Sequence, residues 1–255
     1  MQPLPGTIHR GSDPFAPTHW SVILAASRSE AEPELARAAL ARLCQTYWAP
    51  LYSFVRSRGH SVHDAQDLTQ SFFAYLIQHK IYARADPARG KFRSFLLASL
   101  KNFLGHAYDR EKTLKRGGAF NFVPLDEARA EAAESLFQTH FAANSAPDED
   151  RLFDKSWAEA VVGAAMERLE AEQKAEGKEN LFGKLRSFLT GSADPLPTYE
   201  ELAARLNLTA STLRSQVTRL RARYRHFLRA EVRQTVESDA DIDGELRELF
   251  RVLTS

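Results

Sequence analysis

The chain has 255 residues, of which 44% are hydrophobic and 26% are charged, a composition typical of a soluble globular protein with a buried core. The single cysteine, Cys44, excludes an internal disulfide framework and a cysteine-based zinc site, and it favours a reducing, cytoplasmic environment. No apolar run approaches the ~18 residues that span a bilayer, and the first residues lack the apolar core of a secretion signal. Walker, dinucleotide-binding and G-x-S-x-G motifs are absent from the sequence, so we expect no enzyme, no catalytic residues and no cofactor.

The formal net charge of +1 conceals an uneven distribution of charge along the chain. Residues 84–116 carry nine basic and three acidic side chains, and residues 205–233 carry eight arginines and one glutamate, which gives net charges of +6 and +7. Residues 124–182 carry fourteen acidic and six basic side chains, a net charge of −8. Clustered basic charge favours a polyanionic partner, although a single charged run is more often a solvated helix face.

Hydrophobic periodicity in the first half of the chain predicts helices and no strands. Residues 1–17 are rich in Pro and Gly and are expected to be disordered. Helices are expected over residues 19–27, 33–58, 61–78 and 91–115. The turn residues Gly59, Pro87 and Gly90 separate the later ones. These helices make up a first expected domain, residues 18–116.

The second half begins with a change in composition. Residues 117–151 mix Gly, Pro, Asn and Ser with acids, and they are expected to form a linker with one short helix at 125–140. A second domain, residues 152–235, starts with a helix at 152–173. The tail, residues 236–255, has an amphipathic helix whose apolar positions are Ile242, Leu246, Leu249, Phe250 and Leu253. The expected fold class is therefore all-α, with two small helical domains joined by an acidic linker.

Two short helices near the C-terminus show the most specific local pattern. Thr198 followed by Glu201 is a capping box that begins a helix at 199–206. The turn is Asn207-Leu208-Thr209, in which Asn tolerates the left-handed conformation and Leu208 is expected to fill the core between the helices. The second helix, capped by Thr209 or by Ser211, places Leu213, Val217 and Leu220 on its apolar face. The pattern predicts a helix-turn-helix.

The other face of that second helix is polar and basic. It presents Ser211, Thr212, Arg214, Ser215, Thr218, Arg219 and Arg221. Side chains near the start of such a helix can reach base edges in the major groove, and later arginines can contact phosphates. The alternative interpretation is an ordinary helical hairpin with a solvated face.

The stretch YEELAARLNLT followed by TLRSQVTRLRAR resembles region 4 of the sigma-70 family. The resemblance implies that the second helix recognises a minus-35 promoter element. Asn207 stands in place of the usual Gly, which the turn tolerates. Gln216 stands where a basic residue is usual, so no phosphate contact is carried over to it.

The stretch from residue 40 to residue 77 resembles regions 2.1 and 2.2 of the extracytoplasmic-function sigma factors, most clearly in DAQDLTQSFF. The resemblance implies that this helix docks on the clamp helices of the RNA polymerase β′ subunit. The matching positions are Asp64, Asp67, Gln70 and Phe73. The alternative is that Phe73 belongs to the core and that the two acids only favour the N-terminal end of a helix.

The stretch GKFRSFLLASLKNFLGHAYDREKTLKR resembles regions 2.3 and 2.4, which open and recognise the minus-10 element. Cations along a backbone with polar and aromatic groups around the bases suit single-stranded DNA. The candidate residues are Lys91, Arg93, Lys101, Asn102, Tyr108, Arg110, Lys112, Lys115 and Arg116. Phe92, Phe95 and Phe103 are expected in the core from their helical spacing. His106 stands where the family often has Asp, and no role is carried over to it.

The resemblance covers residues 35–116 and 152–232, and it implies a sigma factor that acts as a polymerase subunit. The implied partners are core RNA polymerase (the β′ clamp helices and the β flap) and promoter DNA, with an anti-sigma protein as a further candidate and no membrane. His63 and Asp67 share a helix face, but two ligands are too few to predict a metal site. The alternative function is a stand-alone helix-turn-helix transcriptional regulator that does not join polymerase.

Overall fold

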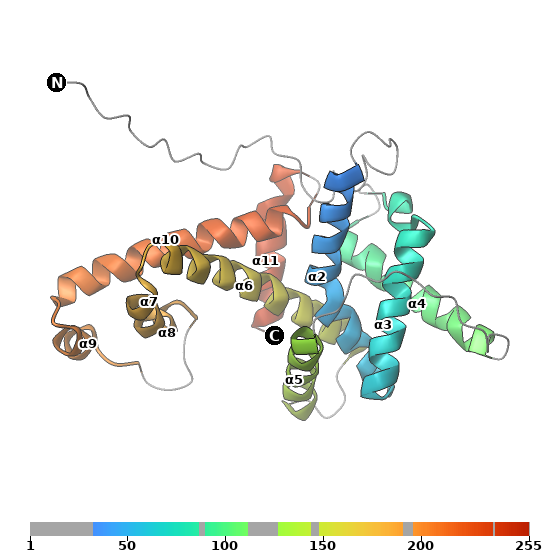
Figure 1. The fold of residues 1–255 in the computed structure, drawn as a ribbon, viewed down its shortest axis with the longest axis horizontal. Coiled ribbons are helices and arrows are strands. Elements are labelled where there is room, and N and C mark those ends of the chain that lie inside the picture. The colour runs from blue at the N-terminus through green and yellow to red at the C-terminus, as the bar shows by residue number, and fades with distance from the viewer. Residues whose placement is uncertain are drawn as a thin grey trace, which may run out of the picture.

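A computed structural model of the chain describes residues 33–86, 90–111, 127–143, 148–190, 196–236 and 238–254. Every regular element in these ranges is helical, which confirms the all-α fold class (Figure 1). The elements are α2 (Pro33–Ser57), α3 (Val62–Gln78), η1 (Ile81–Arg84), α4 (Phe92–Glu111), α5 (Glu127–Ala143), α6 (Glu149–Ala175), α7 (Glu179–Leu185), α8 (Ser187–Thr190), α9 (Tyr199–Leu206), α10 (Ala210–Arg233), η3 (Asp239–Asp241) and α11 (Ile242–Leu253). The helix expected at 19–27 lies outside the described residues. Within the described ranges, no helix has both the length and the apolar character needed to cross a membrane.

The ends of α2 and α3 follow from local chemistry. Gly59 adopts φ 88°, a left-handed conformation that glycine tolerates without strain, and its N–H bonds to the carbonyl of Arg56 as α2 ends. The Ser61 side chain then accepts a hydrogen bond from the backbone N–H of Asp64 at 3.1 Å and begins α3. The two helices therefore lie within one residue of their expected bounds.

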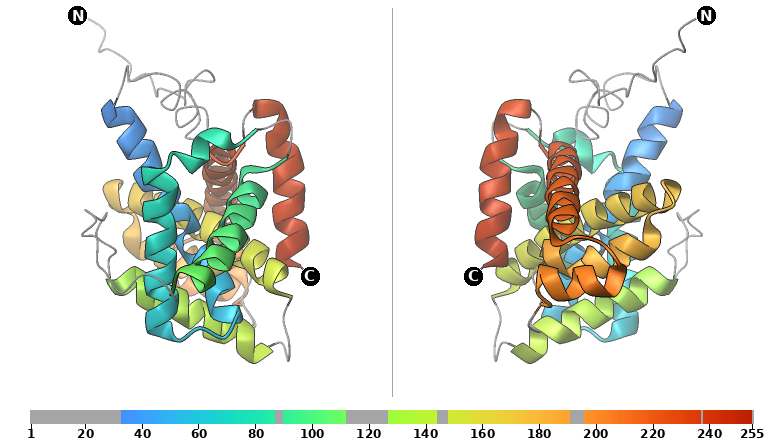
Figure 2. Two further views of the ribbon diagram at one scale, coloured as in Figure 1. Left: turned by 90° about the vertical axis from the view of Figure 1, so that its right-hand side faces the viewer. Right: turned by 90° about the vertical axis from the view of Figure 1, so that its left-hand side faces the viewer.

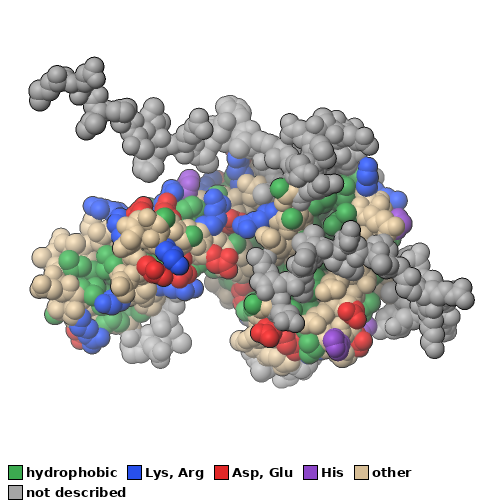
Figure 3. All heavy atoms as spheres, viewed as in Figure 1, with side chains coloured by type: hydrophobic (Ala, Val, Ile, Leu, Met, Phe, Trp, Pro, Cys, Tyr) green, Lys and Arg blue, Asp and Glu red, His purple; other side chains and the backbone are tan. Residues whose placement is uncertain are grey.

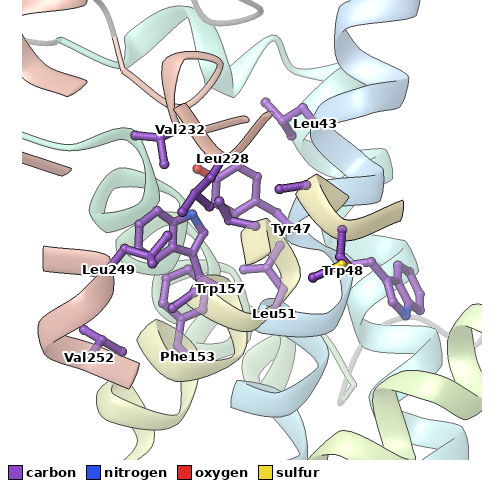
Figure 4. Close-up of a cluster of buried hydrophobic side chains, with 14 of the residues drawn as sticks. Leu43, Tyr47, Trp48, Leu51, Phe153, Trp157, Leu228, Val232, Leu249 and Val252 are labelled. Carbon is purple, nitrogen blue, oxygen red and sulfur yellow. The ribbon is translucent and has the colours of Figure 1, made fainter. Parts of the chain in front are cut away.

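Helix α6 organises the core, because α2, α5, α7, α10 and α11 all pack against it. Trp157 and Phe153 on α6 are fully buried. Figure 4 shows that Trp157 lies next to Leu228 of α10 and Leu249 of α11. The buried side chains form one continuous cluster that extends from α2 to α11. The helices expected in the two domains therefore meet along α6 in this structure. Within the expected linker, the described residues form α5 and the start of α6.

A buried carboxylate ties three of these helices together. Glu231 of α10 is only 6% exposed, and its oxygens accept from Arg42 of α2 at 3.2 Å and from Arg168 of α6 at 2.8 Å. Two cations compensate one anion, and each cation keeps part of its surface in water. The arrangement satisfies the carboxylate while it fixes α10 across α2 and α6.

Helix α5 is held against α2 by a charged cluster. Glu134 accepts from Arg56 through both oxygens, at 2.8 and 2.9 Å, and from the hydroxyl of Tyr52 at 2.5 Å. The guanidinium of Arg56 also lies over the ring of Phe137 at 4.8 Å. These hydrogen bonds, above all those from Arg56, lower the pKa of Glu134 from 4.5 to about 2.

We expect this cluster to make stability depend on pH in the acid range. Because the pKa of Glu134 is lower in the fold than in the unfolded chain, its contribution to the free energy of unfolding is complete above pH 4.5 and is lost as the pH falls towards 2. Its size is on the order of 1 kcal/mol, because solvent screens the partly exposed pair. Urea unfolding of the wild type and of Glu134→Gln should therefore differ at neutral pH and converge in acid. A pH-independent difference would contradict this assignment.

The tail helix α11 buries the expected face except at Phe250, and Leu246 and Leu253 are partly buried against the core. Ile242, Leu249 and Val252 are buried, whereas Phe250 is 53% exposed, so the expectation for Phe250 is wrong. Glu245 shares the buried face and is 4% exposed. There it meets Lys91 and Arg93 at the start of α4.

Candidate nucleic-acid interface

The helix-turn-helix forms at the expected residues, α9 and α10. Thr198 begins α9 with a complete capping box, in which its hydroxyl accepts from the Glu201 N–H at 3.2 Å and its own N–H donates to the Glu201 carboxylate at 2.9 Å. Such a cap contributes about 1 kcal/mol. Thr209 caps α10 by accepting from the N–H of Thr212 at 3.1 Å, which settles the choice between Thr209 and Ser211.

The turn between the two helices shows one expectation confirmed and one wrong. Asn207 adopts the left-handed conformation, with φ 53° and ψ 42°. Leu208 then returns its N–H to the carbonyl of Ala203 at 3.0 Å, and its side chain is 40% exposed rather than filling the core. The buried side chains of the two helices include Leu202 of α9 and Leu213 of α10 instead.

The expected DNA-facing side chains of α10 all lie on its exposed surface. They are Ser211, Thr212, Arg214, Ser215, Thr218, Arg219 and Arg221. The opposite face buries Leu213, Val217 and Leu220. The helix is therefore amphipathic in the expected sense, and it extends from α9 along α6 to α11 (Figure 1). On the face shown in Figure 3, Lys and Arg side chains gather over this half of the molecule, with acidic side chains between them.

Two arginines of this face have protein partners. Arg214 pairs with Glu200 of α9 at 2.5 Å, and its guanidinium lies 5.4 Å from the centre of the Tyr199 ring. Both members of the ion pair are more than half exposed, so the pair is worth at most about 1 kcal/mol and can exchange for another anion. Arg221 donates two hydrogen bonds to the carbonyl of Phe188 at 3.0 and 3.3 Å, which links α10 to α8.

The cations on α4, and Lys91 directly before it, are engaged more extensively. Arg93 is 5% exposed, stacks on the Trp157 ring at 4.2 Å and donates to Asp154 at 3.0 Å and to Glu245. Lys91 pairs with Glu245 at 2.7 Å. Lys101 pairs with Asp150 at 2.6 Å, near the start of α6. Carboxylates of α6 and α11 therefore occupy all three of these cations in this conformation.

The remaining candidates of this surface are less fully described. Asn102 is exposed on α4. Tyr108 and Arg110 lie on the same helix, but their side chains are outside the described structure, as are the whole residues Lys112, Lys115 and Arg116. Phe92 is buried, and Phe95 and Phe103 are partly buried against the core, as their spacing predicts.

The four candidate polymerase contacts divide into two groups. Asp64 and Asp67 are exposed on α3, and Gln70 is partly exposed beside them. Phe73 is 6% exposed and stacks on Trp48 at 6.0 Å between ring centres, so its apolar surface belongs to the core of the α2–α3 pair. Of these four candidates, only the three polar side chains lie at the surface.

Other chemistry at the described residues is limited. No group of three or more His, Cys, Asp or Glu side chains is arranged to hold a metal ion in the ranges that the structure describes. Cys44 is partly buried beside the core, and burial raises the pKa of its thiol to about 12. The thiol therefore stays protonated at neutral pH and is a poor nucleophile.

Two residues that the sequence analysis did not single out become important here. Glu200, in the first turn of α9, pairs with Arg214 of α10. Glu245 pairs with Arg93 of α4. Its spacing from Ile242, Leu249 and Val252 places it on the same, buried face of α11. A charged residue on an otherwise apolar face was the available signal.

Comparison with models of known protein families, with curated proteins and with solved structures finds no match to this chain.

Proposed function

We propose that the chain is a sigma factor of the extracytoplasmic-function type, which binds core RNA polymerase and directs promoter-specific initiation of transcription. In this proposal α10 recognises minus-35 DNA, α4 opens the minus-10 element and α3 docks on the β′ clamp helices. The observation that carries the proposal is the helix-turn-helix, whose cap, left-handed turn residue and exposed polar and basic face all suit a major-groove helix.

The exposed acids of α3 support the polymerase part of the proposal. Asp64 and Asp67 lie on one surface beside Gln70, and they carry the resemblance to the polymerase-binding helix. A helix-turn-helix regulator that acts alone has no need of this surface. In the proposed working form the α2–α4 and α6–α10 parts act on two promoter elements, so the contacts between α4 and the acids of α6 and α11 would open.

A stand-alone helix-turn-helix regulator is the second candidate. The observation that favours it is the engagement of Lys91, Arg93 and Lys101 by carboxylates, which leaves α10 as the accessible basic surface among the described helices. Such a protein would bind duplex DNA without polymerase.

Binding of the full-length chain to core RNA polymerase separates the two candidates. We expect the wild type to be retained by immobilised core polymerase and the double variant Asp67→Ala/Gln70→Ala to be lost, since both side chains lie on the docking face. Lys184→Ala, an exposed change on α7, is the control and should bind as the wild type does. No binding by the wild type, or equal binding by the double variant, would contradict the sigma-factor proposal.

Arg214→Ala tests the DNA-reading helix in the same system. On the promoter found by genomic footprinting, we expect a loss of about 1–3 kcal/mol in DNA affinity if Arg214 contacts a base, with polymerase binding unchanged. Gel-shift titrations on the promoter and on a scrambled duplex measure the effect. An equal loss on both duplexes would identify Arg214 as a phosphate contact instead.

A further inference from the structure

The acids of the C-terminal segment, residues 238–254, meet cations of both basic blocks of the chain. Glu245 pairs with Lys91, directly before α4, and with Arg93 of α4, and Glu248 lies 3.5 Å from Arg93. At the other end of the segment, Asp243 pairs with Arg229 at 2.5 Å and Asp239 with Arg233 at 2.7 Å, both on α10. The segment has five acids and two arginines. The segment is therefore acidic on balance, and its carboxylates lie against two basic surfaces.

The ion pair between Arg93 and Glu245 is buried, and it lies on a helix face that is otherwise apolar. Arg93 and Glu245 are 5% and 4% exposed, and Glu245 shares a helix face with Ile242 and Leu249. An apolar pair of similar size in such a place is often as stable as a buried ion pair or more so. Burial of charge at this point therefore needs a reason other than stability, and exchange of one anion for another is such a reason.

The contact between α11 and α4 is made by charges rather than by close apolar packing. The apolar face of α11 packs on α6 and α10, and the helix lies beside α10 at one edge of the molecule (Figure 2). Towards α4, a cavity of about 520 Å³ remains, lined by Lys91, Phe92, Gly244, Glu245 and Arg247 among others. Ion pairs beside an open cavity can exchange with an incoming anion more easily than an interdigitated apolar surface can separate.

We infer that the segment 239–253 is an autoinhibitory element whose carboxylates take the place of nucleic-acid phosphates on α4 and at the C-terminal end of α10. The inference rests on the proposed role of α4 in DNA binding. In the closed form the segment is paired with α4, and in the open form the segment has left α4. DNA or polymerase favours the open form only by binding it more tightly than the closed form. The free chain thus keeps α4 closed, and its assembly with polymerase and promoter exchanges Glu245 and Glu248 for phosphates.

The test removes the charge of the segment from the full-length chain without removing its packing. Glu245→Gln/Glu248→Gln is nearly isosteric; it leaves Lys91 without its carboxylate partner and Arg93 with Asp154 as its remaining one. Glu167→Gln/Glu179→Gln removes two charges as well, but both of these acids are exposed and lie outside the C-terminal segment, so this variant is the matched control. Binding of a labelled single-stranded oligonucleotide is measured by fluorescence anisotropy over a range of salt.

We expect the segment variant, Glu245→Gln/Glu248→Gln, to bind the single-stranded oligonucleotide about tenfold more tightly than the wild type at low salt. The slope of log affinity against log salt should steepen by about 1.4, as two added phosphate contacts require. The control should change less than about twofold. Equal affinities in both variants, or no gain over the wild type, would overturn the inference. Thermal unfolding verifies that each variant is folded.

Asp239→Asn/Asp243→Asn, which alters only exposed acids, is the second variant and should bind duplex DNA more tightly through Arg229 and Arg233.

Failure of the inference is distinct from failure of the proposed function. If the wild type binds polymerase and promoter in an Arg214-dependent manner but the segment variant gains nothing on single strands, α11 is only a structural helix and the sigma-factor proposal stands. If neither the wild type nor either variant binds DNA, with or without polymerase, the proposed function is overturned and the autoinhibition with it.

Discussion

Trp157→Ala is expected to lower the free energy of unfolding by about 3–5 kcal/mol, the range for loss of a large buried aromatic side chain. Trp157 is fully buried on α6 and lies between Leu228 of α10 and Leu249 of α11 (Figure 4). The change also removes the ring on which Arg93 stacks at 4.2 Å. Since whole domains are stable by only about 5–15 kcal/mol, the variant should be close to unfolding at physiological temperature.

Urea unfolding followed by circular dichroism measures this effect. Trp157→Phe keeps an aromatic ring in the same place and should lose much less. Glu167→Ala, an exposed change on the same helix, should stay within about 0.5 kcal/mol of the wild type. A loss below about 1 kcal/mol for Trp157→Ala would mean that α6 is not the centre of a shared core.

Leu213→Ala is expected to have the largest effect on the helix-turn-helix, a loss of about 2–5 kcal/mol. Leu213 is fully buried where α10 meets α9, so its truncation leaves a cavity between the two helices. Alanine is the best helix former, so the change does not weaken α10 itself and the loss reports packing alone. The orientation of α9 against α10 then loosens, and affinity for promoter DNA should fall with it.

Ser215→Ala is the matched control, because Ser215 is exposed two residues further along the same helix. Its stability should remain within about 0.5 kcal/mol of the wild type. Unfolding curves and gel-shift titrations of both variants complete the test. A stable Leu213→Ala protein that still binds promoter DNA normally would show that α9 does not orient α10.

The helix-turn-helix illustrates how much local pattern can predict. The capping box at Thr198, the cap at Thr209 and the left-handed Asn207 were all expected from residue type and spacing. Each depends on groups within a few residues of one another, so the surrounding fold has little influence on it. The same holds for the bounds of α2 and α3.

The sequence was less informative about whether particular apolar side chains are buried in the core or exposed at the surface. Phe73, for which the sequence left both a docking surface and the core open, lies in the core, and Leu208 is exposed although its type favours burial. In both cases the direction of the side chain depends on how a neighbouring helix packs, and periodicity within one helix does not contain that information.

By itself, the sequence determined the all-α class, the position of most helices and the exposed basic face of α10, because these follow from contacts over a few residues. Only the tertiary structure decided that Arg93 is buried against Trp157 and paired with Glu245, which lies 152 residues further along the chain. The burial of Glu245 on α11 and the single core around α6 were decided in the same way. Contacts at such separations depend on how every helix between them packs, and no local pattern records them.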